Sequence, residues 1–164
     1  MSKTNDKLFL KAGITGKLQK DEIKERHYFD KTENYTLAGS TYSISYIVGS
    51  SEIELKDMIK NTQQLSDKMR PTVMNIIADF KSDYKEDILV SYILNSEVHP
   101  EDSDGILVKF KNAEYCLNPK YLKALKYMED IVSVEYCKND SQFARSLKFR
   151  SPGKQFIIMP IRLH

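Results

Sequence analysis

Cysteine, long apolar runs and excess charge are all scarce in this sequence. Its two cysteines, Cys116 and Cys137, lie in apolar runs without a CxxC spacing, so we expect buried thiols rather than a redox or metal motif. The apolar runs reach about five residues, far short of the roughly 20 that span a bilayer. No apolar segment of a signal peptide follows the first methionine. We therefore expect a cytoplasmic protein without membrane contact.

The charge balance is close to neutral, with a net charge of +2. A basic surface for nucleic acid must therefore come from the placement of the lysines and not from their excess. The 164 residues, of which 41% are hydrophobic, suffice for one domain, or for one domain with a structured arm.

The sequence also lacks the usual motifs of catalysis and metal binding. His27, His99 and His164 are scattered and have no zinc spacing. No serine lies in a nucleophile elbow, and neither cysteine is paired in sequence with a base. Residues 13–18 are too short for a phosphate-binding loop, and residues 101–105 lack the length of a calcium loop. We expect no metal, no cofactor and no enzyme activity; an enzyme assembled from distant residues is the weaker alternative.

Two helices carry clear start signals. Ser51 and Glu54 form a capping-box pattern that predicts a helix over residues 51–69, with Arg70-Pro71 as its stop. Asn118 as N-cap and Pro119 at the first position predict a second helix that reaches Met128.

Alternating and β-branched runs predict strands over residues 8–12, 23–29, 42–48, 73–80, 88–94, 106–110, 114–117, 131–137, 146–149 and 155–163. Residues 97–105 are expected to form a polar turn or loop. Runs of strands interrupted by single helices favour an α+β fold, with antiparallel sheet and two helices on one face.

Lysines recur on the polar side of both predicted helices. They are Lys56 and Lys60 on the first helix and Lys120, Lys123 and Lys126 on the second. Solvent-facing helix surfaces are commonly rich in lysine, which is the simpler interpretation. The second helix, however, offers its three lysines no acidic partner before Glu129, and an unpaired cationic face suits contact with phosphates. We therefore assign these five lysines to sequence-independent binding of duplex DNA.

Two further patterns resemble one known family. Residues 117–126 read Leu-Asn-Pro-Lys-Tyr-Leu-Lys-Ala-Leu-Lys, and residues 157–163 read Ile-Ile-Met-Pro-Ile-Arg-Leu. The first resembles the strand-to-helix junction, and the second the C-terminal strand, in the last domain of the bacterial sliding clamp, the β subunit of DNA polymerase III. The firm resemblance covers about residues 117–164, and a Thr-Asp-Gly-His-Arg-Leu motif of the family's middle domain is missing.

The resemblance implies a role for the C-terminus. In the family this strand lines a hydrophobic cleft for peptides of DNA polymerases and the clamp loader. By position, the cleft would be lined here by Ile158, Met159, Pro160, Ile161, Arg162 and Leu163. A proline in a terminal edge strand would leave methionine and isoleucine exposed as an adaptable patch. A plain core-forming last strand is the alternative.

Together these features predict a clamp-like domain over residues 41–164 with a β-rich N-terminal arm over residues 1–40. The expected function is that of a non-catalytic processivity or clamp-associated factor in DNA replication. The alternative is a protein-interaction module, such as a phage or mobile-element regulator, that keeps the peptide cleft without encircling DNA. Family members hold three such domains per chain and close as dimers, so a ring of single domains would take about six copies. We expect a homo-oligomer, because the exposed strand edges of one such domain need partners.

Overall fold

The computed structural model describes residues 3–14, 27–138 and 146–161. Its helices are α1 (Lys3–Gly13), η2 (Leu55–Asp57), α2 (Arg70–Ala78), α3 (Val90–Leu94) and η3 (Pro119–Tyr127), where η marks a 3₁₀ helix. Its strands are β1 (Tyr28–Lys31), β2 (Tyr35–Gly39), β3 (Ser43–Val48), β4 (Gln63–Gln64), β5 (Tyr84–Leu89), β6 (Val98–His99), β7 (Asp102–Lys109), β8 (Glu114–Leu117), β9 (Ile131–Tyr136), β10 (Leu147–Ser151) and β11 (Lys154–Ile158). Within these ranges no helix is long and apolar enough to cross a membrane.

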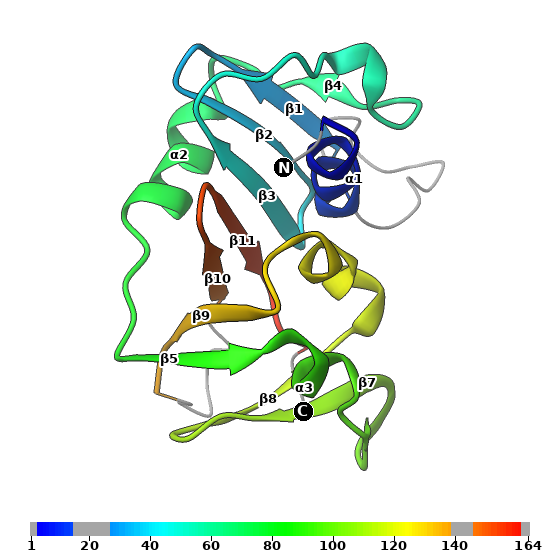
Figure 1. The fold of residues 1–164 in the computed structure, drawn as a ribbon, viewed down its shortest axis with the longest axis vertical. Coiled ribbons are helices and arrows are strands. Elements are labelled where there is room, and N and C mark those ends of the chain that lie inside the picture. The colour runs from blue at the N-terminus through cyan, green and yellow to red at the C-terminus, as the bar shows by residue number, and fades with distance from the viewer. Residues whose placement is uncertain (1–2, 15–26, 139–145, 162–164) are drawn as a thin grey trace.

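The strands form one large and one small sheet. The large sheet has the order β4-β1-β2-β3-β11-β10-β9-β5, and the small one the order β6-β7-β8. All neighbours pair antiparallel except β1 and β4, which are parallel. The last strand, β11, pairs with β3 on one side and with β10 on the other. Because the first and last thirds of the chain meet there, the middle of the large sheet joins segments that are distant in sequence (Figure 1).

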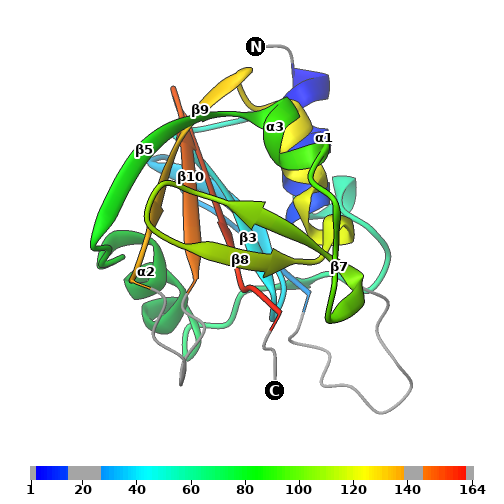
Figure 2. The same ribbon diagram turned by 90° about the horizontal axis from the view of Figure 1, so that it is seen from below.

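Helices cover both faces of the large sheet. In Figure 1, α1 and the yellow η3 lie side by side on one face, and α2 lies on the other. Figure 2 shows that the small sheet closes the molecule below them. The main core fills the space between α1, η3 and the two sheets, with Phe9, Leu122 and Phe156 fully buried. A second cluster lies under α2, where Val73 and Ile77 pack against sheet residues that include Ile157.

The predicted α+β class is confirmed, as is the helix after Asn118. The predicted strands 42–48, 106–110, 114–117, 131–137 and 146–149 all have counterparts in the structure. The division of the chain after residue 40 stays a prediction. The two strands that flank it, β2 and β3, pair with each other from Tyr35↔Val48 to Gly39↔Ile44.

The helix predicted over residues 51–69 is wrong. A capping box exists there, but it is formed by Glu54 and Asp57 around the single turn of η2. The backbone is already extended at Met58, and Asn61 has a φ of 74°, in the left-handed region that ends a helix. The apolar positions that suggested a helix are used by an irregular segment instead, in which Met58 and Leu65 are buried.

Two predicted strands are helices. Residues 8–12 belong to α1, whose Phe9 and Leu10 face the core. Its last residue, Gly13, lies so close to Ser45 and to the carbonyl oxygen of Ala38 that a Cβ there would meet both below 3 Å. Most of residues 73–80 belong to α2. Pro71, interpreted from the sequence as a stop, lies in its first turn, where the missing N–H costs nothing.

Other boundaries also differ from the prediction. The strand predicted over residues 88–94 ends at Leu89 and continues as α3. The loop predicted over residues 97–105 contains β6 and the start of β7, and β2 was not predicted. The strand predicted over residues 155–163 begins at Lys154 and ends at Ile158. Most of the strand predicted over residues 23–29 lies outside the described residues.

Asp30 holds together one end of the large sheet and α2. Its buried carboxylate accepts hydrogen bonds from the Tyr35 hydroxyl (2.6 Å), from Gln64 Nε2 (2.7 Å) and from Arg70 Nε (2.9 Å). Burial alone would raise the pKa of Asp30, but these bonds and the charge of Arg70 outweigh it and hold the pKa below its usual range. One carboxylate thus ties β1, β2, β4 and the first turn of α2 together.

The other end of α2 is held by a lysine. Lys148 of β10 donates from Nζ to the carbonyl oxygen of Ile77 at 2.7 Å and lies 5.5 Å from the centre of the Phe80 ring. Burial lowers the pKa of Lys148 to about 8, and the nearby charge of Arg150 acts in the same direction. Because a helix C-terminus carries unsatisfied carbonyls, this contact caps α2.

Candidate functional site

The three lysines of η3 lie in one row. The side chain of Asn118 caps the helix by accepting from the N–H of Lys120 at 3.0 Å. In a 3₁₀ helix residues three apart eclipse one another. Lys120, Lys123 and Lys126 therefore form a single exposed row, while Leu122 and Leu125 form the buried one. With a rise of about 2 Å per residue, successive lysines are spaced by about 6 Å along the helix axis.

The helix that carries the lysine row is packed against α1 and held there by polar contacts. Lys154 of β11 reaches between the two helices: its Nζ donates to the carbonyl oxygen of Tyr127 at 2.8 Å and lies 3.3 Å from Asp6 Oδ1. The same ammonium group lies 5.0 Å from the centre of the Phe9 ring. Among the described ion pairs, none involves Lys120, Lys123 or Lys126, so their charges are available to a ligand.

Lys56 and Lys60 come from a different kind of segment than predicted. Lys56 lies in the single turn of η2 and Lys60 in the irregular stretch after it, and both are exposed. Lys7 of α1 lies 3.4 Å from Asp57 Oδ1 and so holds η2 next to α1. The structure therefore places η2 next to α1, which in turn packs along η3. We call η2, α1 and η3 the helical layer.

Two basic residues of this layer were missed by sequence reasoning. Lys7 and Lys11 of α1 were assigned to or next to a strand, although their spacing of four residues would place them on the same side of a helix. Lys11 is half-buried, and Lys7 is engaged with Asp57. Of these two lysines, Lys11 is the one for which the structure describes no ion pair.

The C-terminal run crosses from the large sheet to the small one. Ile158 is buried within the ladder of β11, opposite Ser43 and Leu147. The N–H of Met159 then donates to the Tyr42 carbonyl at 2.8 Å, and that of Ile161 to the Cys116 carbonyl at 2.8 Å. Because β11 is central, the expectation of a terminal edge strand is wrong. Arg162 and Leu163 lie outside the described residues.

Two apolar side chains are exposed at the start of this run, those of Met159 and of Tyr42, whose carbonyl accepts the Met159 N–H. The Tyr42 ring, 43% exposed, stacks on Tyr121 of η3 with 5.2 Å between ring centres and an angle of 4°. Met159 is 36% exposed, and its sulfur accepts a hydrogen bond from the Ser146 hydroxyl at 2.9 Å. Pro160 is buried and Ile161 is half-buried. Of the six C-terminal residues predicted to line a cleft, Met159 is the one that the described structure leaves most open.

Met159→Ala should cost little stability. Because the side chain is more than a third exposed, the loss in the free energy of unfolding should stay below about 1 kcal/mol, whereas a packed core position would cost roughly 2–5 kcal/mol. Chemical denaturation of the variant measures this difference. Ile158→Ala, at a fully buried neighbour in the same run, serves as the core control, and equal costs for both would identify Met159 as a core residue.

Comparison with known proteins finds similarity in structure alone. No protein-family model and no curated protein matches the chain by sequence. Among solved structures, the DNA polymerase III β subunit of Borrelia burgdorferi aligns over 99% of this chain with a TM-score of 0.61 and 11% identity. The sliding clamp of Bacillus subtilis aligns over 98% with a TM-score of 0.61 and 12% identity.

A third solved structure is the β clamp of Helicobacter pylori bound to a DNA ligase peptide, at a TM-score of 0.58 and 12% identity. The chain spans 63% of the length of each of these three clamp chains. The sequence resemblance to the bacterial sliding clamp is thus confirmed at the level of the fold. The similarity in fold covers 98–99% of the chain, beyond residues 117–164.

Proposed function

We propose that this protein is a non-catalytic, sliding-clamp-like factor that binds duplex DNA without reading its sequence and serves as a processivity or clamp-associated factor in replication. The observation that carries the proposal is the exposed row of Lys120, Lys123 and Lys126 on η3, which packs against α1. The layer belongs to a fold shared with clamp chains over 98–99% of this chain.

The chemistry of the row fits phosphates rather than bases. Lysine ammonium groups act as compact point charges, and contacts to the phosphate backbone position a protein on the duplex without carrying sequence information. The row stands on a helix whose other sides pack against the core and against α1. Lys56 and Lys60 extend the basic surface beyond α1 on the same layer.

Fluorescence anisotropy with two labelled duplexes of unrelated sequence tests this function. We expect both to bind at low salt with dissociation constants that agree within a few-fold, because backbone contacts carry no sequence information. A strong preference for one duplex, or no binding to either at low salt, contradicts the proposal.

A second candidate function is peptide binding without encircling DNA, as in a phage or mobile-element regulator. The observation that favours it is the exposed patch of Tyr42 and Met159 beside the stacked Tyr121. Tyrosine offers a large contact area at low entropic cost, and the flexible methionine side chain adapts its shape to apolar peptide residues. Titration of a clamp-binding peptide of the Gln-x-x-Leu-Phe type against the parent protein and Met159→Ala tests the peptide site. Peptide binding by a parent protein that binds no duplex DNA would favour this second function over the first. Weaker binding by the variant supports a peptide site at this patch.

The proposal also includes the partners and the compartment. DNA polymerase or clamp-loader peptides would bind at the C-terminal run, and duplex DNA at the helical layer. A protein that works on replicating DNA in this way belongs in the cytoplasm and carries out no reaction itself. Homo-oligomerisation follows from the open edges of the large sheet, which need partners.

A further inference from the structure

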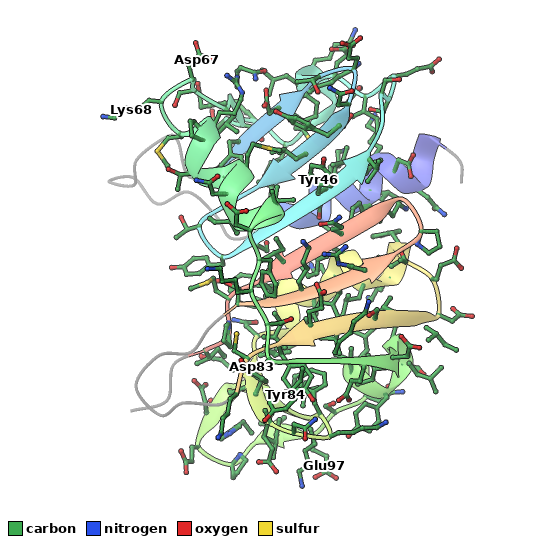
Figure 3. All side chains as sticks on the ribbon, turned by 90° about the vertical axis from the view of Figure 1, so that its left-hand side faces the viewer. Tyr46, Asp67, Lys68, Asp83, Tyr84 and Glu97 are labelled. Atoms are coloured by element: carbon green, nitrogen blue, oxygen red, sulfur yellow. The ribbon has the colours of Figure 1, made fainter. Side chains whose placement is uncertain are left out.

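Two lysines of the large sheet are almost completely buried. Lys148 of β10 and Lys154 of β11 are each 2% exposed, although lysine is rarely buried without a partner for its charge. Lys148 lies opposite Ile157 in the ladder of the two strands. Because the side chains of a strand alternate between its faces, Lys154, three residues before Ile157, points to the other face. Figure 3 looks onto the face that carries α2 and Lys148, and α1 and η3 lie behind the sheet in that view.

Both ammonium groups bind a carbonyl oxygen at the C-terminal end of a helix. Lys148 donates to Ile77, the last residue but one of α2, at 2.7 Å. Lys154 donates to Tyr127, the last residue of η3, at 2.8 Å. Each ammonium group also lies over a phenylalanine ring, 5.5 Å from its centre in one case and 5.0 Å in the other. Because the last carbonyls of a helix lack partners within it and favour a cation, the two lysines anchor a helix to the sheet in the same way.

Lys154 differs from Lys148 in that it joins two helices. Its Nζ lies 3.3 Å from Oδ1 of Asp6 in α1, and among the described ion pairs it is the one that links α1 to the large sheet. Burial lowers the pKa of Lys154, and the Asp6 carboxylate offsets this in part. Tyr127, its carbonyl partner, directly follows Lys126, the last lysine of the row. The end of η3 that carries Lys126 is thus tied through one ammonium group to α1 and to β11.

We propose that Lys154 is a positioning residue for DNA binding, which holds the C-terminal end of η3 against α1 and so sets the placement of the lysine row. The inference rests on the proposed function, because the placement of the row matters only if the row binds DNA. A buried ion pair often stabilises a fold no more than apolar side chains of similar volume do, and in some proteins it selects one packing arrangement over others. Apolar contacts are non-directional, whereas a hydrogen bond to a carbonyl has a defined geometry.

The loss of this anchor should act on one end of the row. Helix ends fray, and Lys126 lies in the turn of η3 that Lys154 holds. Without the hydrogen bond to Tyr127, Lys126 loses its phosphate contact first. Lys120 keeps its own, because it lies beside the N-cap Asn118 at the other end of the helix.

The salt dependence of duplex binding tests this role. Fluorescence anisotropy with a labelled duplex compares the parent with Lys154→Met and with D6A/K154M, which removes both charges of the pair. Each variant should bind about 5-fold or more weakly at about 0.1 M salt and make the slope of the logarithmic salt dependence shallower by about one. The Lys154 side chain is 1% exposed and contacts no phosphate itself, so this change reports on the row. Adding Lys126→Ala to Lys154→Met should change the slope no further, because the same contact is already lost.

Asp6→Ala separates positioning from charge and, at a side chain 24% exposed, is the mildest of these changes. Removing a carboxylate reduces the repulsion of phosphates, so long-range electrostatics alone would tighten duplex binding. Loss of the link between Lys154 and α1 should instead weaken binding about 2-fold or more. Tighter binding by Asp6→Ala would overturn the proposal, also if the variants of Lys154 do not fold.

Lys148→Met is the matched control. It removes a buried lysine and a helix anchor of the same kind from the neighbouring strand, but its helix, α2, lies on the other face of the sheet (Figure 1). It should leave the slope of the salt dependence unchanged. Chemical denaturation of Lys148→Met and Lys154→Met gives the stability that each anchor contributes, so that a loss of stability is not mistaken for a loss of positioning.

The remaining outcomes are equally decisive. A slope that D6A/K154M leaves at the parent value would make Lys154 a structural residue alone and overturn the proposal, whatever the variant loses in stability. Equal changes in slope for Lys148→Met and Lys154→Met would overturn it as well. Both results require a parent that binds the duplex, and they leave the proposed function intact. A parent that binds no duplex at low salt contradicts the proposed function and this inference with it.

Discussion

Replacing Lys120, Lys123 and Lys126 together by glutamate is expected to remove detectable binding to duplex DNA. The three side chains form one exposed row on η3, and reversing their charge turns three attractions to phosphate into three repulsions. From the salt dependence of phosphate contacts, the loss in affinity should be about 100-fold or more. Because the buried rows of η3 remain unchanged, the free energy of unfolding should change little.

The matched control reverses three exposed lysines that lie outside the helical layer. Lys68, Lys81 and Lys138 are exposed and belong to none of η2, α1 and η3. Their replacement by glutamate changes the net charge by the same amount and should reduce affinity by less than about 10-fold, through the long-range field alone. Equal losses in the two triple variants would show that net charge, and not the row, determines binding.

Asp30→Ala is expected to lower the free energy of unfolding by about 3 kcal/mol. Breaking a buried ion pair costs roughly 3–5 kcal/mol, and the value should lie at the lower end of that range because Arg70 is partly exposed. The variant leaves the Tyr35 hydroxyl, the Gln64 amide and the Arg70 guanidinium without their common acceptor. Urea denaturation followed by circular dichroism measures the change.

Asp67→Ala is the matched control, because Asp67 also pairs with Arg70 but its side chain is 97% exposed. An ion pair of that exposure should contribute less than about 0.5 kcal/mol. A cost for Asp30→Ala as small as that for Asp67→Ala would contradict the role assigned to the buried carboxylate.

Lowering the pH should destabilise the folded protein through the carboxylate of Asp30. The pKa of Asp30 is lower in the folded protein than the value of about 3.9 in an unfolded chain. The unfolded state therefore binds more protons in the interval between the two values, and stability rises with pH there. The contribution of Asp30 is fully present above that interval and is lost as pH falls through the folded-state pKa. As the pH falls from about 4 through the folded-state pKa, the parent should lose more stability than Asp30→Ala.

The elements predicted correctly from the sequence were those whose conformation is determined mainly by local interactions. η3 begins at Asn118 and Pro119 as predicted, because the Asn118 side chain satisfies the Lys120 N–H and the missing N–H of a proline costs nothing in the first turn. The strands over β3, β7, β8 and β9 followed from runs of apolar and β-branched residues that pack in this sheet. The motif at residues 157–163 identified the fold of the family before the structure extended the similarity to the whole chain.

The failures occurred where tertiary contacts decide between states that the sequence allows equally. Leu8, Phe9 and Leu10 are compatible with a strand or a helix; packing along η3 and the anchor from Lys154 favour the helix. Pro71 is compatible with the end of one helix or with the start of another. The hydrogen bond from Arg70 to Asp30, 40 residues away in sequence, favours the start of α2 at this position. The row formed by the η3 lysines depends on a 3₁₀ conformation that their spacing alone does not reveal.

The salt dependence of duplex binding tests the central claim most directly. If Lys56, Lys60, Lys120, Lys123 and Lys126 each contact one phosphate, the logarithm of the binding constant should fall with the logarithm of salt concentration at a slope of about −4.5. Lys123→Ala should make that slope shallower by about one. A parent slope near zero, or a slope that Lys123→Ala leaves unchanged, would contradict the assignment of the helical layer to DNA.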